Sequence, residues 1–170
     1  LELGGCGRSH GGLGRRVADV LEDVGAVGHP RWFQLYWYTD RELTRSLIDR
    51  AHAAGYSAIV LTVDSAIFGW REGEQRVTLV KPDGAWAVNL PEDVSTIVQE
   101  QTITWNDLAW LRSVSPLPIV LKGIIRGIDA RLAVEHGIDG IMVSNHGGRQ
   151  VDGGIATIDA LPAVVAAVRA

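Results

Sequence analysis

The chain has 170 residues, of which 46% are hydrophobic and 21% are charged, so wholesale disorder is excluded and a single domain is expected. The net charge is −4 and the Lys and Arg residues are scattered, which argues against a nucleic-acid or anionic-membrane partner and favours a small molecule. The chain is also too short for a closed eight-stranded (β/α) barrel, which takes about 250 residues.

A single cysteine, Cys6, rules out an intrachain disulfide and a Cys-rich zinc site. No stretch approaches the roughly 20 apolar residues of a membrane span. The sequence shown does not open with a basic segment followed by an apolar one, as a secretory signal would. We therefore expect a cytoplasmic protein with no membrane partner and no metal.

Residues 1–30 form an atypical N-terminal segment. They are rich in glycine, with basic residues between the glycines, and contain no apolar run long enough for a strand. We expect a loose segment there. One short amphipathic helix is predicted at 17–24, where apolar residues recur at i, i+3, i+4 and i+7.

A strand, a helix and a second strand are predicted next. Residues 32–38 are aromatic and β-prone. The Thr39–Glu42 spacing is that of a capping box, which begins a helix running to about Ala54. Gly55 then suits a left-handed cap, and 57–63 is an almost uninterrupted apolar run, typical of a strand covered on both faces. The buried stripe of the helix is expected to be Leu43, Leu47, Ile48 and Ala51.

A long polar connection separates this second strand from the rest of the chain. Residues 64–101 show little periodicity apart from a short strand expected at 77–80, and 73–103 is interpreted as a shortened, lid-like insert. The alternation then resumes with a helix starting at Thr104, a strand at 119–122, a helix at 129–136, a strand at 140–144 and a helix at 157–169.

This alternation of strands and helices predicts an α/β fold with a parallel sheet built by right-handed crossovers. An open doubly wound sheet and part of a (β/α)₈ barrel both satisfy it. Each strand ends in polar side chains, as on the carboxyl-end rim where barrel enzymes assemble their active sites, and this favours a partial barrel of about four βα units. The polar residues are Gln34, Tyr36, Thr62, Asp64, Lys122, Ser144 and His146.

His146 and Arg149 lie three residues apart in a glycine-rich turn directly after a strand. The pair suits a base beside an anion clamp; the alternative is a histidine with only a structural hydrogen bond. Asp64 is the natural partner of His146, because an anionic neighbour fixes the imidazole tautomer and favours its protonated form. Arg71 and Arg149, if they converge, would grip a carboxylate. Lys122 is either a snorkelling side chain or a positive charge facing a cofactor that becomes anionic on reduction.

Five motifs in register carry a resemblance to a known family. Together they resemble the FMN-dependent α-hydroxy acid oxidases and dehydrogenases, the family of glycolate oxidase, lactate oxidase and lactate 2-monooxygenase. The resemblance covers about residues 31–72 and 104–169. The motifs are Phe33-Gln34-Leu35-Tyr36, Leu61-Thr62-Val63-Asp64, Gly69-Trp70-Arg71, Leu121-Lys122-Gly123 and Ser144-Asn145-His146-Gly147-Gly148-Arg149-Gln150.

The resemblance implies an enzyme that oxidises a small L-2-hydroxy acid, with lactate the best candidate, to the 2-oxo acid. It implies that His146 is the base that removes a proton from the substrate and that Asp64 supports its imidazolium. It implies that Arg149 and Arg71 hold the substrate carboxylate and that Tyr36 hydrogen-bonds near the carboxylate or hydroxyl. Proton removal at carbon, and removal at oxygen with hydride transfer, are both compatible with these roles.

The resemblance also implies FMN as the cofactor. Gln34 and Thr62 are implied to contact the isoalloxazine ring, and Lys122 to stabilise the reduced, anionic flavin beside N1 and the C2 carbonyl. Only family strands 3 to 6 are expected in this chain. The further strands whose Asp-Gly-Gly motif and later Gly-Arg pair bind the FMN phosphate are not expected.

Two functional hypotheses from different classes follow. The first is the enzyme just described, acting alone or completed by missing barrel segments. The second is a non-catalytic partial barrel or gene fragment that cannot hold FMN alone and associates, with itself or with a partner, through open sheet edges. Another FMN barrel, such as an isomerase or a nucleotide dehydrogenase, explains less well why His146 and Arg149 accompany Asp64.

Overall fold

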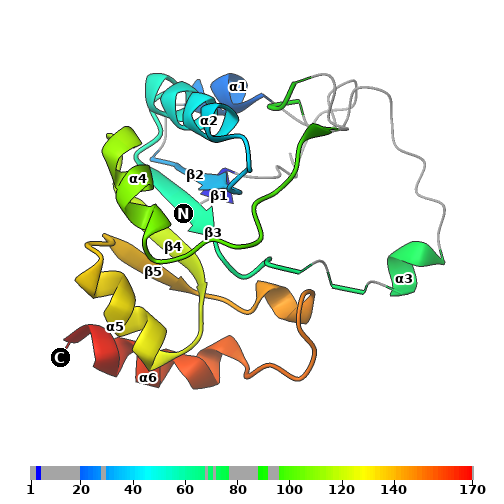
Figure 1. The fold of residues 1–170 in the computed structure, drawn as a ribbon, viewed down its shortest axis with the longest axis vertical. Helices are drawn as coiled ribbons and strands as arrows, with labels where there is room; N and C mark the ends of the chain where they lie inside the picture. Colours follow the sequence, from blue (N-terminus) through cyan, green and yellow to red (C-terminus); the bar gives the residue numbers. More distant parts are fainter. Residues whose placement is uncertain are drawn as a thin grey trace.

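A computed structural model describes residues 3–4, 20–27, 30–67, 69–70, 72–76, 88–91 and 96–169. Its centre is one parallel sheet of five strands in the order β1-β2-β3-β4-β5 (Figure 1). The strands are β1 Leu3–Gly4, β2 Trp32–Leu35, β3 Ala58–Thr62, β4 Ile119–Ile124 and β5 Gly140–Val143. The four predicted strands are confirmed. The two-residue β1 was not predicted, because it is too short to show a period.

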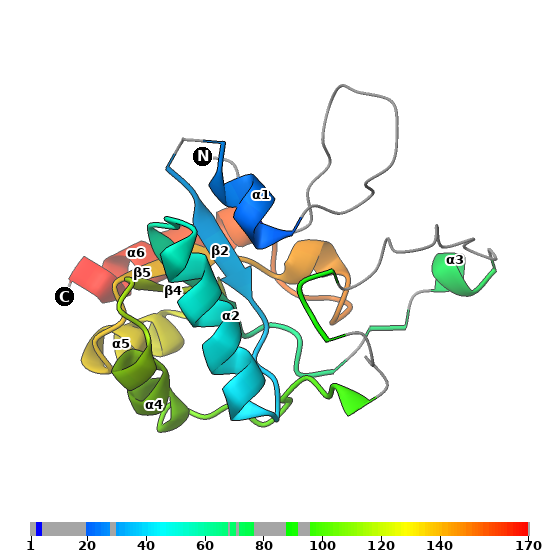
Figure 2. The same ribbon diagram turned by 90° about the horizontal axis from the view of Figure 1, so that it is seen from above.

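The helices follow the predicted alternation, and α3 is an additional short helix that lies away from the rest of the ribbon in both views (Figures 1 and 2). The predicted helix at 17–24 is found from Leu21 onward, and 17–19 and the strand predicted at 77–80 lie outside the described residues. The helices are α1 Leu21–Gly25, α2 Arg41–Ala53, α3 Glu72–Gln75, α4 Asp107–Val114, α5 Gly127–Glu135 and α6 Thr157–Arg169.

The strand order decides between the two architectures that the sequence left open. The strands lie in the sheet in the same order as along the chain, so that each strand pairs only with strands that are next to it in the sequence. A doubly wound sheet reverses its strand order at a switch point, whereas a (β/α) barrel adds its strands consecutively. The sheet is therefore part of a barrel wall, as the polar strand ends indicated.

The two faces of the sheet have different partners. The strand residues that pack into the main hydrophobic cluster with the helices are Phe33, Leu35, Ile59, Leu61, Ile119 and Leu121. The residues that alternate with them, such as Gln34, Thr62 and Lys122, therefore face the other side, since successive side chains on a strand point to opposite faces. All five residues of β3 are buried, as expected for a central strand covered on both faces.

Helix α2 begins at a different cap from the one predicted. The side chain of Asp40, not Thr39, accepts hydrogen bonds from the backbone N–H groups of Glu42 and Leu43, at 2.9 and 3.1 Å. The Thr39 hydroxyl instead donates to the Val98 carbonyl oxygen at 3.2 Å. Thr39 thus contacts the returning end of the insert and does not cap the helix.

The other α2 predictions hold. Leu47, Ile48 and Ala51 are buried, and Leu43 is half-buried against the same cluster. Gly55 ends the helix with φ +79°, in the left-handed region.

Helices α2 and α4 are joined by a cation–π cluster. The guanidinium of Arg41 lies 5.3 Å from the ring centroid of Trp37 and 4.8 Å from that of Trp110, and it forms an ion pair with Asp107 at 2.8 Å. Trp37, the residue directly after Tyr36, is only 2% exposed. A cation held between aromatic faces stabilises by about 0.5–2 kcal/mol, depending on its desolvation. The cluster therefore fixes the chain just beyond the end of β2.

Within the described part of the chain, no helix is long and apolar enough to cross a bilayer.

Candidate active site

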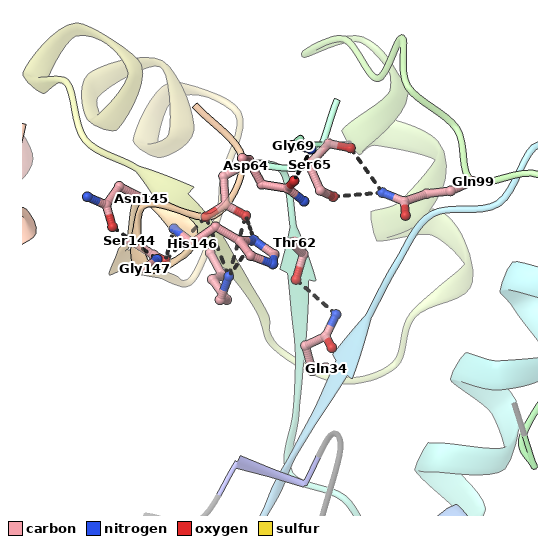
Figure 3. A network of polar contacts seen from close by, with 12 residues as sticks. Gln34, Thr62, Asp64, Ser65, Gly69, Gln99, Ser144, Asn145, His146 and Gly147 are labelled. Carbon is pink, nitrogen blue, oxygen red and sulfur yellow. Dashed lines mark hydrogen bonds and ion pairs between the residues drawn. The ribbon is translucent and has the colours of Figure 1, made fainter. Parts of the chain in front are cut away.

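Asp64 is the centre of a polar cluster at the carboxyl ends of β3, β4 and β5 (Figure 3). Its Oδ1 lies 2.8 Å from Nδ1 of His146, and its Oδ2 accepts a hydrogen bond from the Ser144 hydroxyl at 3.2 Å. Nζ of Lys122 lies 3.4 and 3.5 Å from the two carboxylate oxygens. The side chains of Asp64, His146 and Lys122 are 10%, 16% and 19% exposed. The predicted Asp64–His146 pair is thus brought together, mostly shielded from solvent.

This geometry determines which imidazole nitrogen of His146 is available for chemistry. An ionised carboxylate only accepts hydrogen bonds, so the 2.8 Å contact assigns a hydrogen to Nδ1 of His146. In the neutral ring Nε2 then carries the lone pair. The site can therefore accept a proton at Nε2, and Asp64 stabilises the imidazolium that results.

Strand β4 is irregular directly after Lys122. Lys122 pairs with Thr62 on one side and Met142 on the other, and the register with β5 shifts between Lys122 and Ile124. The intervening Gly123 has φ +122°, and a Cβ atom there would lie 2.6 Å from Cβ of Asp64. Bulges of this kind re-aim side chains next to active sites. Only glycine lets Asp64 approach β4 this closely.

The turn that carries His146 is held in a costly backbone conformation. His146 has φ +58°, a conformation that costs a non-glycine residue about 1–3 kcal/mol and that clusters at functional sites. Its backbone N–H donates to the Ser144 hydroxyl at 3.1 Å. The Asn145 side chain accepts from the Gly147 N–H at 3.1 Å and donates to the Ile155 carbonyl at 3.2 Å. The turn is therefore preformed around the histidine.

Ser144 and Gly123 are residues of this site to which the sequence assigned no role. Ser144 connects Asp64 to the backbone of His146 through one hydroxyl. Its place at a strand end and its place in the motif that contains His146 were the signals available, but a serine is common in turns and neither signal specified its contacts. Gly123 stood in a recognised motif, but its contact with Asp64 depends on the bulge.

The predicted flavin-contacting pair forms a second cluster beside the first. The Gln34 amide donates to the Thr62 hydroxyl at 2.9 Å, from the adjacent strands β2 and β3 (Figure 3). Tyr36 follows β2 and is half-buried. Burial raises the pKa of Tyr38, with a smaller contribution from the neighbouring Tyr36 phenol. Amide and hydroxyl groups here, with the Lys122 ammonium at the same level of the sheet, fit the nitrogens and carbonyls of an isoalloxazine ring.

The two predicted arginines have different outcomes. Arg149 is exposed, three residues after His146 on the same turn. Arg71 lies outside the described residues. The convergence of the two guanidinium groups thus stays a prediction.

An Asp-Gly-Gly tripeptide does follow His146, contrary to expectation, at Asp152-Gly153-Gly154. It lies exposed in the connection between β5 and α6, directly after the His146 turn rather than after a further strand. We therefore assign it no phosphate-binding role.

A cavity of about 200 Å³ lies at the carboxyl ends of β3 and β4. It is lined mainly by Val63, Ser65, Gln99, Trp105 and Leu108, and also by Thr62, but not by Asp64, Lys122 or His146. The candidate active site is therefore identified by the polar side chains that meet at Asp64, and not by this cavity.

Comparison with known proteins gives consistent matches. The sequence profile of a family described as FMN-dependent dehydrogenase matches residues 13–170. The chain is 49% identical over 169 residues to an L-lactate oxidase from a Nostoc species, covering 87% of this chain and 46% of that protein. It is 43% identical over 169 residues to mouse 2-hydroxyacid oxidase 1, covering 87% and 45%.

Solved structures match as well. A mandelate oxidase with (S)-2-phenylpropionate superposes with a TM-score of 0.79 at 42% identity, covering 88% of this chain and 42% of that one. A mandelate oxidase variant with a C4a-OH-FMN adduct gives a TM-score of 0.79 at 41% identity, covering 88% and 43%.

A consecutive parallel sheet whose carboxyl ends converge on a carboxylate, an imidazole and an ammonium defines the class: part of a (β/α) barrel with a polar cluster on the strand-end rim, where barrel enzymes place their active sites. The chain belongs to the family of FMN-dependent dehydrogenases, as its profile match and its relatives show. It spans less than half the length of the curated relatives it matches.

Proposed function

We propose that this chain carries the substrate-oxidising part of an FMN-dependent enzyme that converts a small L-2-hydroxy acid to the 2-oxo acid. The observation that carries the proposal is the shielded contact of Asp64 with His146, with Lys122 beside both. L-lactate is the favoured substrate, because relatives described as L-lactate oxidases are 49% and 43% identical to this chain.

The proposed chemistry assigns one task to each group. His146 accepts a proton from the substrate at Nε2, and Asp64 stabilises the positive charge that the imidazole acquires. Arg149, together with Arg71, holds the substrate carboxylate, since a guanidinium binds a carboxylate through two parallel hydrogen bonds. Tyr36 orients the substrate through its phenol. Holding the substrate in one geometry contributes to the rate alongside the proton transfer.

FMN, when bound, supplies the acceptor for the two electrons that leave the substrate. Gln34 and Thr62 would hold the ring, and Lys122 would supply a positive charge where the reduced flavin is anionic. Lys122 contacts Asp64 and His146 as well, so the same ammonium would be shared between the base and the cofactor.

The test is spectroscopic and needs no coupled assay. Purified chain is mixed with FMN, freed of excess, and treated anaerobically with L-lactate, with D-lactate as the matched control. The proposal expects yellow protein whose visible flavin absorption bleaches with L-lactate only. Protein that stays colourless with added FMN would refute independent catalysis by this chain.

A second candidate function is a partial barrel that holds no FMN alone and associates through its sheet edges. The edge strand β5 favours it, since all four of its residues are only half-buried. Exposed edges and apolar patches promote association. The large apolar side chains that α5 and α6 leave exposed are Ile128, Val134, Ile158, Leu161 and Val168.

Size-exclusion chromatography with light scattering distinguishes this candidate. It expects an oligomer whose size depends on concentration, or tight binding of a chain that supplies further strands. A stable monomer with cooperative unfolding would contradict it. The cytoplasmic location expected from the sequence stays a prediction.

A further inference from the structure

The loops that follow β3 and β5 are joined at a second place besides the Asp64–His146 contact. The backbone N–H of Gly69 donates a hydrogen bond to the side-chain oxygen of Gln150 at 2.8 Å. Gly69 lies in the loop that begins with Asp64, and Gln150 directly follows Arg149 (Figure 3 shows Gly69 beside this cluster). The bond therefore spans two loops that are 81 positions apart in the sequence.

The close approach at Gly69 is an independent observation of the same contact. A Cβ atom on Gly69 would lie 2.0 Å from the carbonyl oxygen of Arg149 and 2.9 Å from Cα of Gln150. Real Cβ atoms do not come this close to backbone, so no other residue fits without moving the Arg149 backbone. The hydrogen bond and the absence of a side chain on glycine together let the two loops pack directly against each other.

We propose that Gln150 is a positioning residue that fixes the backbone of Arg149 relative to the Asp64–His146 pair. Gln150 ties the chain immediately after Arg149 to the loop that starts at Asp64. Asp64 holds His146 at one end of the turn, and Gly69 holds Gln150 at the other end. The backbone from which the Arg149 side chain extends is therefore held in one position. The part of this proposal that concerns substrate rests on the proposed function, in which Arg149 holds the carboxylate.

Two substitutions at Gln150 separate the loss of the hydrogen-bond acceptor from the change of residue. Gln150→Leu removes the acceptor oxygen at nearly constant size, whereas Gln150→Glu keeps an oxygen in its place. Gln101→Leu makes the same change at an exposed position and serves as the matched control.

The first measurement is amide hydrogen exchange at Gly69 in the whole chain. Loss of one hydrogen bond is expected to speed Gly69 exchange in Gln150→Leu by about tenfold. Gln150→Glu and Gln101→Leu should stay near wild type. Unchanged exchange in Gln150→Leu would overturn the proposal, since the bond would then not hold the loop.

The second measurement is flavin reduction with FMN and L-lactate. A misplaced guanidinium weakens carboxylate binding, so KM should rise about 3- to 10-fold in Gln150→Leu with little change in kcat, and Gln150→Glu should restore it. Faster Gly69 exchange with an unchanged KM overturns the link to substrate. A wild-type chain that never reduces FMN refutes the proposed function and that link with it, while the exchange experiment still decides whether Gln150 positions the loop.

Discussion

Gly123 offers the sharpest test of how the site is built, because one added methyl group at that position should disturb both the sheet and Asp64. The residue has φ +122°, and a Cβ atom would lie 2.6 Å from Cβ, 2.8 Å from Cγ and 2.8 Å from the backbone nitrogen of Asp64. The backbone nitrogen and Cβ cannot move by rotation of the side chain, so only a shift of the backbone would relieve these two contacts. Gly123→Ala must therefore shift β4 or the start of the Asp64 loop.

Two costs add in the Gly123→Ala variant. A residue other than glycine held in a sparsely populated backbone region costs about 1–3 kcal/mol. Overpacking a well-packed position costs about 1–3 kcal/mol more. The free energy of unfolding should therefore fall by about 2–6 kcal/mol, a large part of the 5–15 kcal/mol that is typical of a domain.

Urea unfolding followed by circular dichroism measures this loss. Gly154→Ala is the matched control, because its nearest neighbour to an added Cβ is a carbonyl oxygen 3.9 Å away. That control should change the free energy of unfolding by less than about 0.5 kcal/mol. Equal unfolding midpoints and slopes for the two variants would refute the reasoning about Gly123.

Three further predictions concern stability, and urea unfolding checks each. Asp40→Ala should cost about 1 kcal/mol by removing the α2 cap, and Thr39→Ala less. Arg41→Lys should cost about 0.5–1 kcal/mol, since a compact ammonium does not replace a planar guanidinium that lies near two indole rings and hydrogen-bonds Asp107; wild-type stability would argue against that cluster. The Arg112 guanidinium, and then the Ile119 backbone N–H, lower the pKa of Asp139. Asp139 therefore stabilises the fold above about pH 4 and loses this contribution as pH falls through its folded pKa. The free energy of unfolding of Asp139→Asn should therefore fall less steeply with acid than that of wild type. The difference between the two proteins should be small, because the Arg112–Asp139 pair is largely exposed.

Most of the helices and strands could be predicted from the sequence, because apolar residues recur at the buried positions of each element. The apolar run at 57–63 indicated a strand covered on both faces, and β3 is buried throughout. The consecutive order of the strands was not readable from alternation alone. The two-residue β1 carried no period, and the sequence did not show that Asp40 rather than Thr39 caps α2.

The site was predictable at the level of residue types and less so at the level of contacts. Asp64 and His146 were paired correctly, since both follow strands that end on one rim. The contact of Lys122 with this pair was not foreseen, because the order of residues along a strand does not give the distance between side chains on neighbouring strands. Gln150 was missed for a similar reason: its partner, Gly69, is a backbone group in a distant loop, and nothing in the sequence marks that bond.

In the proposed reaction His146, held by Asp64, removes the substrate proton while electrons pass to FMN. Anaerobic single-turnover reduction of bound FMN by L-lactate, compared between wild type and His146→Asn, tests it most directly. We expect both proteins to bind FMN and reduction in the variant to be slower by about 10²–10⁴-fold, the usual contribution of a general base. Equal reduction rates in the two proteins, or a wild-type chain that binds FMN and leaves it oxidised, would contradict it.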